Sequence, residues 1–174
     1  MSEGAVLVRR LWPQEWQAYR AIRLRALADA PEAFGATLAE AQAWSPEHWE
    51  ARVANAAVSG IDCPLVAEAG GLFVGLLWAK VDAHDAGRVN LFQMWVAPES
   101  RGRGVAAALL HEALGWARER GTRVVHLGVN SANAGALRLY ERAGFHPIGE
   151  PYLMREGATH MEQEMRLDLC GTTG

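Results

Sequence analysis

One stretch, residues 91–117, constrains the fold of this chain more than any other. Residues 91–96 are an apolar run rich in strand formers, Pro98 ends the run, and residues 101–106 (RGRGVA) open a helix whose first turn carries no acidic side chain. The first amide groups of a helix have no partner within it, the helix dipole is positive there, and glycines let an anion approach the backbone. The stretch therefore predicts a strand, a glycine turn and a helix start that suits a phosphate group.

The residues after this turn predict a βαβ unit. The helix is expected over residues 104–120 with Gly121 as its stop, and residues 124–129 form an apolar run rich in valine. A strand that is reached through a single helix is expected to lie parallel to the strand before it. The unit therefore supplies a central pair of parallel strands joined by a right-handed crossover.

The flanking segments predict a mostly antiparallel sheet around this pair. Period-two alternation and turn residues indicate strands over residues 5–11, 63–69, 72–82, 88–96, 145–149 and 161–169. Helical spacing and capping residues indicate helices over residues 13–29, 46–58 and 133–143, with a loop or broken helix over 32–44 and a loop of about ten residues after 149. The fold class is α/β (α+β): a mixed, mostly antiparallel sheet of about 6–7 strands with a central parallel pair, flanked by about 4 helices.

Length and charge bound the class of protein. The 174 residues suit a single domain over 1–170, followed by a disordered tail over 171–174. A net charge of −3 gives no general attraction to nucleic acid or anionic lipid, and no apolar run approaches the roughly 20 residues of a membrane span. Two cysteines do not make a disulfide framework, and the N-terminus lacks the form of a signal peptide. We therefore expect a cytoplasmic protein with no nucleic-acid or membrane partner.

The first predicted helix carries three arginines, Arg20, Arg23 and Arg25. Long basic side chains normally lie outside a domain. We interpret all three as the solvated side of that helix, and an anion site is the alternative.

Three interpretations of the glycine turn compete. A Walker A loop is excluded because the turn lacks the required Gly-Lys-Ser/Thr ending. Residues 102–107 match the loose dinucleotide pattern G-x-G-x-x-A, but the acidic residue expected at the end of the next strand is absent, since that strand ends Gly128-Val129-Asn130. In the third interpretation the glycines serve only the geometry of the turn.

Two motifs resemble the signatures of the GNAT superfamily of acyl-CoA-dependent N-acyltransferases. Residues 101–106 are similar to its Arg/Gln-x-x-Gly-x-Gly/Ala signature, and residues 130–145 (NSANAGALRLYERAGF) are similar to its Asn-x-x-Ala-x-x-Leu-Tyr-x-x-x-Gly-Phe segment. The order of predicted strands and helices also fits that family. The resemblance implies the GNAT fold and an N-acetyltransferase that uses acetyl-CoA as co-substrate and no metal.

The resemblance also implies which residues hold the cofactor. Backbone pairing with the pantetheine arm falls to the end of the strand, and the pyrophosphate falls to the amides of the glycine turn, with its two arginines adding charge. Asn133 has an equally good role as the cap of its own helix. The implied cofactor-binding residues are Met94, Trp95, Val96, Arg101, Gly102, Arg103, Gly104, Val105, Ala106, Asn133, Ala136, Tyr140 and Arg142.

The implied chemistry needs an acid. Acyl transfer from a thioester requires an unprotonated amine, stabilisation of the oxyanion and a proton for the departing thiolate. Tyr140 matches the family's usual general acid, although packing with Leu137 and Phe145 would also explain a tyrosine there.

The base is where this sequence departs from the family pattern. Alternation places Asn90, Phe92 and Met94 on one face of their strand. Many relatives carry Glu or His at the positions of Asn90 or Phe92, and Gly128 replaces a Glu found in members that acetylate protein N-termini. We therefore expect deprotonation through water to a more distant group, or a substrate amine that is already largely neutral. The candidate groups are Glu68, Asp82, His84 and His126.

The acceptor is the least specified part of the expected reaction. Phe34 is at the place where relatives form part of the acceptor pocket, and with Asn90 and Phe92 it makes the implied substrate-binding set. We expect a small-molecule amine or an exposed lysine as substrate, with an apolar or aromatic part. The alternative is a non-catalytic acyl-CoA-binding sensor or interaction module. A homodimer is a further expectation by analogy, with the last strand as an edge for pairing.

Overall fold

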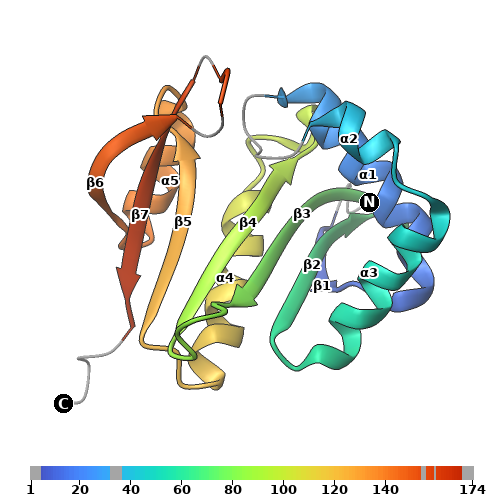
Figure 1. Cartoon of the computed structure of the whole chain (residues 1–174), viewed down its shortest axis with the longest axis horizontal. Coiled ribbons are helices and arrows are strands. Elements are labelled where there is room, and N and C mark those ends of the chain that lie inside the picture. The colour runs from blue at the N-terminus through green and yellow to red at the C-terminus, as the bar shows by residue number, and fades with distance from the viewer. Residues whose placement is uncertain (1–4, 32–36, 154–155, 159, 170–174) are drawn as a thin grey trace.

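A computed structural model describes residues 5–31, 37–153, 156–158 and 160–169. Within these residues one seven-stranded sheet runs in the order β1-β2-β3-β4-β5-β7-β6, and β4 and β5 are its parallel pair (Figure 1). The strands are β1 (Leu7–Arg10), β2 (Asp62–Ala69), β3 (Leu72–Val81), β4 (Arg88–Val96), β5 (Val124–Asn130), β6 (His146–Leu153) and β7 (Met161–Asp168). The helices are α1 (Trp16–Asp29), α2 (Leu38–Gln42), α3 (Pro46–Ser59), α4 (Val105–Glu119) and α5 (Ala134–Arg142), with short 3-10 turns at Pro13–Glu15 and Pro98–Ser100. The predicted sheet and its central parallel pair are confirmed.

Residues 32–44 were expected to form a loop or a broken helix, and their described part contains the short helix α2. Thr37 begins this helix with a capping box: the Glu40 amide donates to Thr37 Oγ1 at 3.1 Å, and the Thr37 amide donates to the Glu40 carboxylate at 3.3 Å. Strand β6 continues to Leu153 rather than ending at 149, because pairing with β7 resumes at Tyr152 after an irregularity.

The two faces of the sheet are covered by different helices. A side chain added at Gly75 of β3 would meet Leu109 and Val105 of α4 at 3.1 and 3.3 Å, which places α4 on that face. Trp78 is an odd number of residues away and points to the other face, where its ring lies 5.8 Å from the ring of Tyr19 in α1. Helices α1 and α3 therefore cover the opposite face from α4. Figure 1 shows α1 and α3 at the right of the molecule, on the side of β1–β3, and no helix of the described residues in front of β5, β7 and β6.

The parallel strands β4 and β5 pair along only part of their length. Their partners run from Arg88 with Val124 to Leu91 with Leu127, and pairing stops there. Figure 1 shows the two strands close together at one end and apart at the other, like the arms of a V. Beyond Leu91 and Leu127 the two strands still pair with β3 and β7, but the backbone groups on the sides that face each other have no strand partner.

A β-bulge in β4 accompanies this split. Phe92 pairs with Trp78 but Trp95 pairs with Leu76, so two residues of β4 stand opposite one of β3. Gln93, inside the bulge, has a positive φ of 64°, and its side-chain oxygen accepts a hydrogen bond of 2.6 Å from Tyr19. The extra residue reverses the alternation, so the prediction that Met94 shares a face with Phe92 was wrong. Phe92 and Trp95 face α1 and α3, and Met94 faces α4.

The C-terminal strand is not an edge of the sheet. Strand β7 pairs with β5 on one side and with β6 on the other, so the expectation that the last strand offers an edge for dimer pairing was wrong. The chain returns from β6 to insert β7 between two strands that precede it, which no local pattern in the sequence reveals. Strands β1 and β6 form the two edges.

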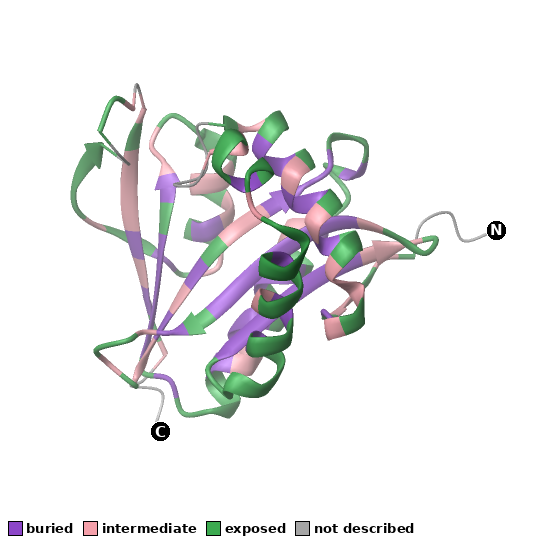
Figure 2. Ribbon diagram, turned by 45° about the vertical axis from the view of Figure 1, so that its right-hand side comes forward, coloured by how far each residue is buried: buried purple, intermediate pink, exposed green. Residues whose placement is uncertain are grey.

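The core runs along the central strands. Figure 2 shows buried residues along the middle strands of the sheet and on the sheet-facing sides of the helices, whereas β6 is largely exposed. One residue contradicts the sequence-based interpretation: Arg23 of α1, expected on the solvated side, is only 6% exposed. Arg23 faces the sheet because α1 lies flat on β3, and its guanidinium reaches the cleft described below. No helix of the described residues is long and apolar enough to cross a membrane.

Candidate active site

A cleft of about 1260 Å³ lies where β4 and β5 separate. Its lining comes from both arms of the V, from the first turn of α4 and from α5. Side chains of β7, α1 and α3 line it on the face of the sheet opposite α4. The cleft therefore opens toward both faces of the sheet through the split.

The glycine turn forms one wall of this cleft. Gly102 and Gly104 have positive φ values of 78° and 79°, and a side chain added at either glycine would meet nothing within 4 Å. Gly104 is the N-cap of α4, and the first turn of α4 holds no acidic residue. A positive helix terminus next to open space, with exposed amides and no side chain in the way, is suited to a phosphate group.

Arg101 is held at the edge of this wall. Its Nε donates to the carbonyl of Val96 at 3.0 Å, and its guanidinium makes an ion pair of 2.7 Å with Asp29 of α1. Asp29 also accepts a 2.9 Å hydrogen bond from the Trp95 indole, and the bonds from Trp95 and Arg101 hold the pKa of Asp29 below its usual value. The guanidinium therefore sits beside the glycine turn in a fixed position.

The cleft gathers most of the residues that the sequence pointed to. Arg103 is not among the lining residues, and Phe34 lies outside the described residues. The predicted residues that line the cleft are Asn90, Phe92, Met94, Trp95, Val96, Arg101, Gly102, Gly104, Val105, Ala106, Asn133, Ala136, Tyr140 and Arg142.

Tyr140 of α5 lies in the cleft but is almost enclosed by protein. The residue is 6% exposed, and its ring meets Phe145 edge-on at 5.8 Å between centroids. Burial raises the pKa of Tyr140 to about 12, because the phenolate would lose its hydration. The hydroxyl therefore holds its proton across the physiological range and can donate it.

Asn133 caps α5, which was one of the two roles expected for it. Its side-chain oxygen accepts a 3.0 Å hydrogen bond from the Ala136 amide. The cap uses only the oxygen, so the amide nitrogen of Asn133 is available for a second contact in the cleft that Asn133 lines.

Three of the four candidate bases lie elsewhere. Glu68 pairs with Arg9 at 2.7 Å, and Asp82 accepts a 2.9 Å hydrogen bond from Asn90, which together with the His84 amide lowers the pKa of Asp82. His84 is exposed in the turn before β4. None of the three lines the cleft.

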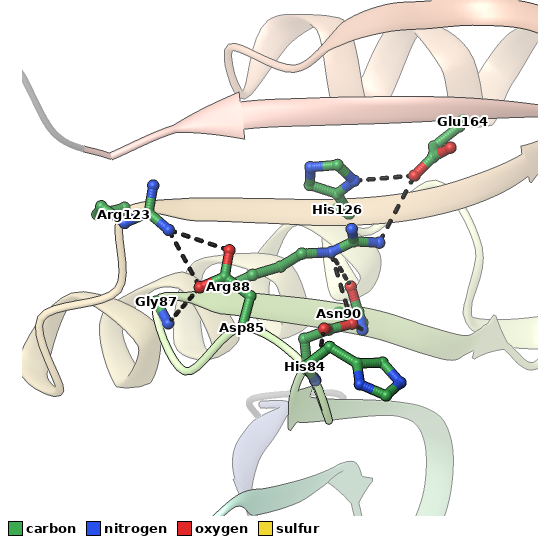
Figure 3. Close-up of polar contacts among 9 residues, drawn as sticks. His84, Asp85, Gly87, Arg88, Asn90, Arg123, His126 and Glu164 are labelled. Atoms are coloured by element: carbon green, nitrogen blue, oxygen red, sulfur yellow. Dashed lines mark hydrogen bonds and ion pairs between the residues drawn. The ribbon is translucent and has the colours of Figure 1, made fainter.

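His126 is the candidate that does line the cleft. It stands beside Asn90 in the closed part of the V, is 9% exposed, and its Nδ1 lies 2.8 Å from a carboxylate oxygen of Glu164 in β7. Figure 3 shows Arg88 reaching across from β4 to the same carboxylate, with an N–O distance of 3.7 Å, while Arg88 Nε donates to Asn90 at 2.8 Å. A histidine–carboxylate pair thus forms the floor of the cleft on the side away from α4.

A second carboxylate, that of Glu162, lies on the same strand as Glu164. Glu162 of β7 leans over Gly128 of β5, so that a side chain added at Gly128 would lie only 2.5 Å from the Glu162 carboxyl carbon. The Tyr152 hydroxyl donates to Glu162 at 2.8 Å, and burial together with this carboxylate raises the pKa of Tyr152 to about 12. Glu162 therefore places a carboxylate where a side chain of residue 128 would otherwise project. We refer to Glu162 and Glu164 as the carboxylate pair.

Sequence reasoning missed the carboxylate pair. Alternation along residues 161–169 does place Glu162 and Glu164 on one face of a strand, and that was the available signal. Their position in the cleft depends on β7 lying beside β5, which the chain order does not specify.

Two arginines line another part of the cleft: Arg52, which sequence reasoning missed, and Arg23, for which an anion site was the alternative interpretation. Arg23 of α1 and Arg52 of α3 both line it, and we refer to them as the arginine pair. The Arg52 guanidinium lies 5.1 Å from the ring centroid of Trp78, which in turn stacks on Phe92 at 6.3 Å. A smaller hollow of about 350 Å³ continues from this point and shares Arg52 and Phe92 with the cleft.

The residues present fit acetyl-CoA. The split strands offer unpaired backbone, the glycine turn offers an open anion site, and both border one continuous cleft. Among the described residues no group of three or more His, Cys, Asp or Glu side chains could hold a metal ion.

Comparisons with known proteins agree with this geometry. The model of the acetyltransferase (GNAT) family matches residues 21–145. The chain is 35% identical over 133 residues to a mycothiol acetyltransferase of Thermobispora bispora, an alignment that covers 74% of this chain and 42% of that protein. The chain thus spans less than half the length of that relative, and the same holds for a second mycothiol acetyltransferase, from Acidothermus cellulolyticus, of which 45% is covered.

Solved structures share the fold at lower identity. A GNAT-family acetyltransferase from Streptococcus pneumoniae superposes with a TM-score of 0.81 at 21% identity, over 92% of this chain and 97% of that one. An acetyltransferase from Salmonella typhimurium, solved with its cofactor acetyl-CoA, superposes with a TM-score of 0.79 at 21% identity, over 97% of this chain and 96% of that one.

Proposed function

The chain belongs to the GNAT family of acetyltransferases, which take the acetyl group from acetyl-CoA, and from that premise we propose that it acetylates the primary amine of a small molecule or an exposed lysine, with Tyr140 as the general acid. The names of the mycothiol acetyltransferases support a small-molecule acceptor.

Donor binding is assigned to backbone groups. The amides from Gly102 to Ala106 would receive the pyrophosphate, and Arg101 beside them would add positive charge. The end of β4 from Met94 to Val96 has no strand partner on its β5 side, and there it would pair with the pantetheine arm as a further strand does. Asn133 would donate its amide N–H to the same arm while its oxygen caps α5.

The reaction forms a bond between the amine nitrogen and the acetyl carbon and breaks the bond from that carbon to sulfur. The bulge at Gln93 and Met94 leaves backbone groups outside the pairing with β3, and we assign a strand amide there to the carbonyl oxygen, whose negative charge grows as the amine adds. Tyr140 then donates its phenolic proton to the departing sulfur. Its raised pKa, to about 12, keeps the hydroxyl protonated at physiological pH, so that the proton is present when the sulfur departs.

The amine must lose a proton, and we assign this step to Glu162. Its carboxylate stands over Gly128 in the open part of the V, where an amine can approach from the face opposite α4. His126 and Glu164 lie deeper, in the closed part, and can take the proton onward. Asn90 and Phe92 border the same space, where we expect them to contact the acceptor.

The observation that carries the proposal is the meeting of Tyr140 and Glu162 in one cleft with the glycine turn. The test is steady-state release of CoA thiol from acetyl-CoA across a panel of amines, with the acetylated product identified by mass spectrometry. We expect turnover that saturates with at least one amine.

The alternative is a protein that binds acetyl-CoA but does not catalyse transfer. Such a sensor or interaction module would bind CoA and give no acetylated product with any amine. The presence of an acid and a carboxylate on opposite sides of the cleft favours the enzyme.

A further inference from the structure

The acceptor side of the cleft has charges of opposite sign on two sides. The carboxylate pair, Glu162 and Glu164, lies on β7, and the arginine pair, Arg23 and Arg52, extends from α1 and α3 over β3 and β4. Arg88 also lines the cleft between them, but it already lies near the carboxylates of Asp82 and Glu164, at 3.7 Å from each. A ligand in this space therefore meets negative charge at one end and positive charge at the other.

Arg52 is held in place by aromatic rings rather than by a carboxylate. Its guanidinium lies 5.1 Å from the centroid of Trp78 and 5.9 Å from that of Trp44. Within the described residues no ion pair of Arg52 with an acidic side chain is found. Arg52 also forms a side-chain hydrogen bond with the Tyr19 hydroxyl, which uses part of its five N–H donors. Its other N–H groups can donate to an anion in the cleft.

Arg23 adds to this charge from a more buried position. It is 6% exposed, and burial lowers its pKa; the neighbouring Arg52 lowers it further, while Tyr19 acts in the opposite direction. Arg23 and Arg52 thus bring two positive charges to the lining of one cleft, and an anion bound there is attracted by both.

We propose that the acceptor is a primary amine that also carries an anionic group, and that Arg52, with Arg23 beside it, binds that group while the amine lies at Glu162. The proposal rests on the acetyltransferase function above and names the class of its acceptor. Gly128 lies on β5 and Arg52 lies over Trp78 of β3, and these strands are separated by β4, which makes two strand spacings of roughly 4.8 Å each. An amine over Gly128 therefore reaches Arg52 only through a chain of several bonds, and a carboxylate or a phosphate at the far end has the required chemistry.

The test compares two amines that differ in charge alone, 4-aminobutyrate and 4-aminobutanamide. Each is titrated calorimetrically into the protein with CoA bound, and each is assayed for acetylation with acetyl-CoA. We expect the carboxylate to bind about tenfold more tightly than the amide, in line with one charge-assisted hydrogen-bonded pair. Phosphoethanolamine against ethanolamine repeats the comparison for a phosphate.

Three variants assign the preference to its residue. Arg52→Met keeps an unbranched apolar stem but removes the guanidinium and its charge, and it should bring the ratio of the two dissociation constants close to one. Arg52→Lys should retain part of the preference. Arg20→Met, on α1 but outside the cleft, should retain all of it and serves as the matched control.

Two outcomes overturn the inference: equal binding of the two amines by the wild-type protein, or a preference that survives Arg52→Met. If Arg52→Met does not fold, the wild-type ratio and Arg52→Lys still decide. Charge-selective binding without acetylation would support the arginine site and contradict the proposed enzyme. Acetylation of both amines at equal efficiency would support the enzyme and contradict only the arginine site.

Discussion

The cleft has two halves that the protein builds by different means. The donor half consists of the end of β4, the glycine turn and the start of α4, and it offers mainly backbone amides from one continuous stretch, residues 94–106. The acceptor half consists of the carboxylate pair, His126 and the arginine pair, and it offers side chains from β5, β7, α1 and α3. A site that consists of backbone groups is therefore specified by local sequence. A site that consists of side chains from several elements depends on how distant segments come together.

The largest predicted effect breaks the donor half alone. Gly104→Glu places a carboxylate at the N-terminus of α4, where the donor's phosphates are expected, and should weaken CoA binding on the order of 1000-fold through repulsion at a few ångströms. Gly104→Gln is the matched control, since it carries the same strain at a φ of 79° without the charge. Equal CoA affinity of the two variants, measured by calorimetry, would contradict the phosphate assignment.

The next effect concerns the residue where the halves meet. Tyr140→Phe removes one hydroxyl and should lower kcat about 100-fold while CoA affinity changes little, because the acid acts only as the thiolate departs. Single-turnover kinetics and CoA titration separate the two quantities. Full activity of Tyr140→Phe would remove Tyr140 as the acid.

The pH profile gives a second check on the same residue. A raised pKa keeps Tyr140 protonated, so the wild-type kcat should not fall between pH 9 and about pH 11 on account of this group. The free energy of unfolding depends on pH through the same group. The contribution from the neutral buried phenol is fully present below the usual tyrosine pKa of about 10 and is lost as pH rises toward about 12. A descending limb of kcat near pH 10 that disappears in Tyr140→Phe would show that burial does not raise this pKa.

A smaller effect sharpens the acceptor half. Glu162→Gln should lower kcat about tenfold at neutral pH, less than the usual range for a lost general base because His126 and Glu164 remain. Gly128→Ala should act in the same way, since its added carbon would displace the Glu162 carboxylate from a distance of 2.5 Å.

Glu119→Gln, at the end of α4 and outside the cleft, is the control for both substitutions. CoA affinity should be unchanged in all three variants. If Gly128→Ala and Glu162→Gln were both as active as the control, the proton would leave by another path.

The smallest effect separates capping from cofactor binding. Ser45→Ala removes the N-cap of α3, where Ser45 accepts from the His48 amide at 3.1 Å, and should cost about 1 kcal/mol of unfolding free energy with no change in CoA affinity. Asn133→Ser keeps a cap on α5 but loses the amide N–H, so it should keep its stability and weaken CoA binding several-fold. Thermal unfolding and CoA titration of the two variants should give opposite patterns, and loss of stability alone in Asn133→Ser would leave Asn133 as a cap only.

Most of the fold could be predicted from the sequence because, like the donor half, it is specified by local patterns. The glycine turn, the run of valines after α4 and the capped helix at Asn133 are local patterns, and each specifies an element together with its neighbour. The parallel pair followed because a strand reached through one helix returns alongside the strand before it.

The remainder depended on contacts that are distant in sequence. The insertion of β7 between β5 and β6 places Glu162 over Gly128, and no spacing of residues in the sequence predicts this contact. The bulge at Gln93 moved Met94 to the face of β4 opposite the expected one. The bulge forms through the pairing of β4 with β3 and the hydrogen bond from the Tyr19 hydroxyl, and both partners are distant in sequence. Arg23 was assigned to solvent by its charge, although the helix that carries it packs against the sheet at that point.

Calorimetric titration of CoA into variants of both halves tests most directly whether the cleft is divided in this way. Gly104→Glu and its control Gly104→Gln represent the donor half, and Glu162→Gln and Arg52→Met represent the acceptor half. We expect only Gly104→Glu to lose CoA binding, while the two acceptor variants bind CoA as the wild type does and fail only in the use of an amine. CoA binding that weakens as strongly in Glu162→Gln or Arg52→Met as in Gly104→Glu would contradict the division of the cleft into a backbone donor site and a side-chain acceptor site.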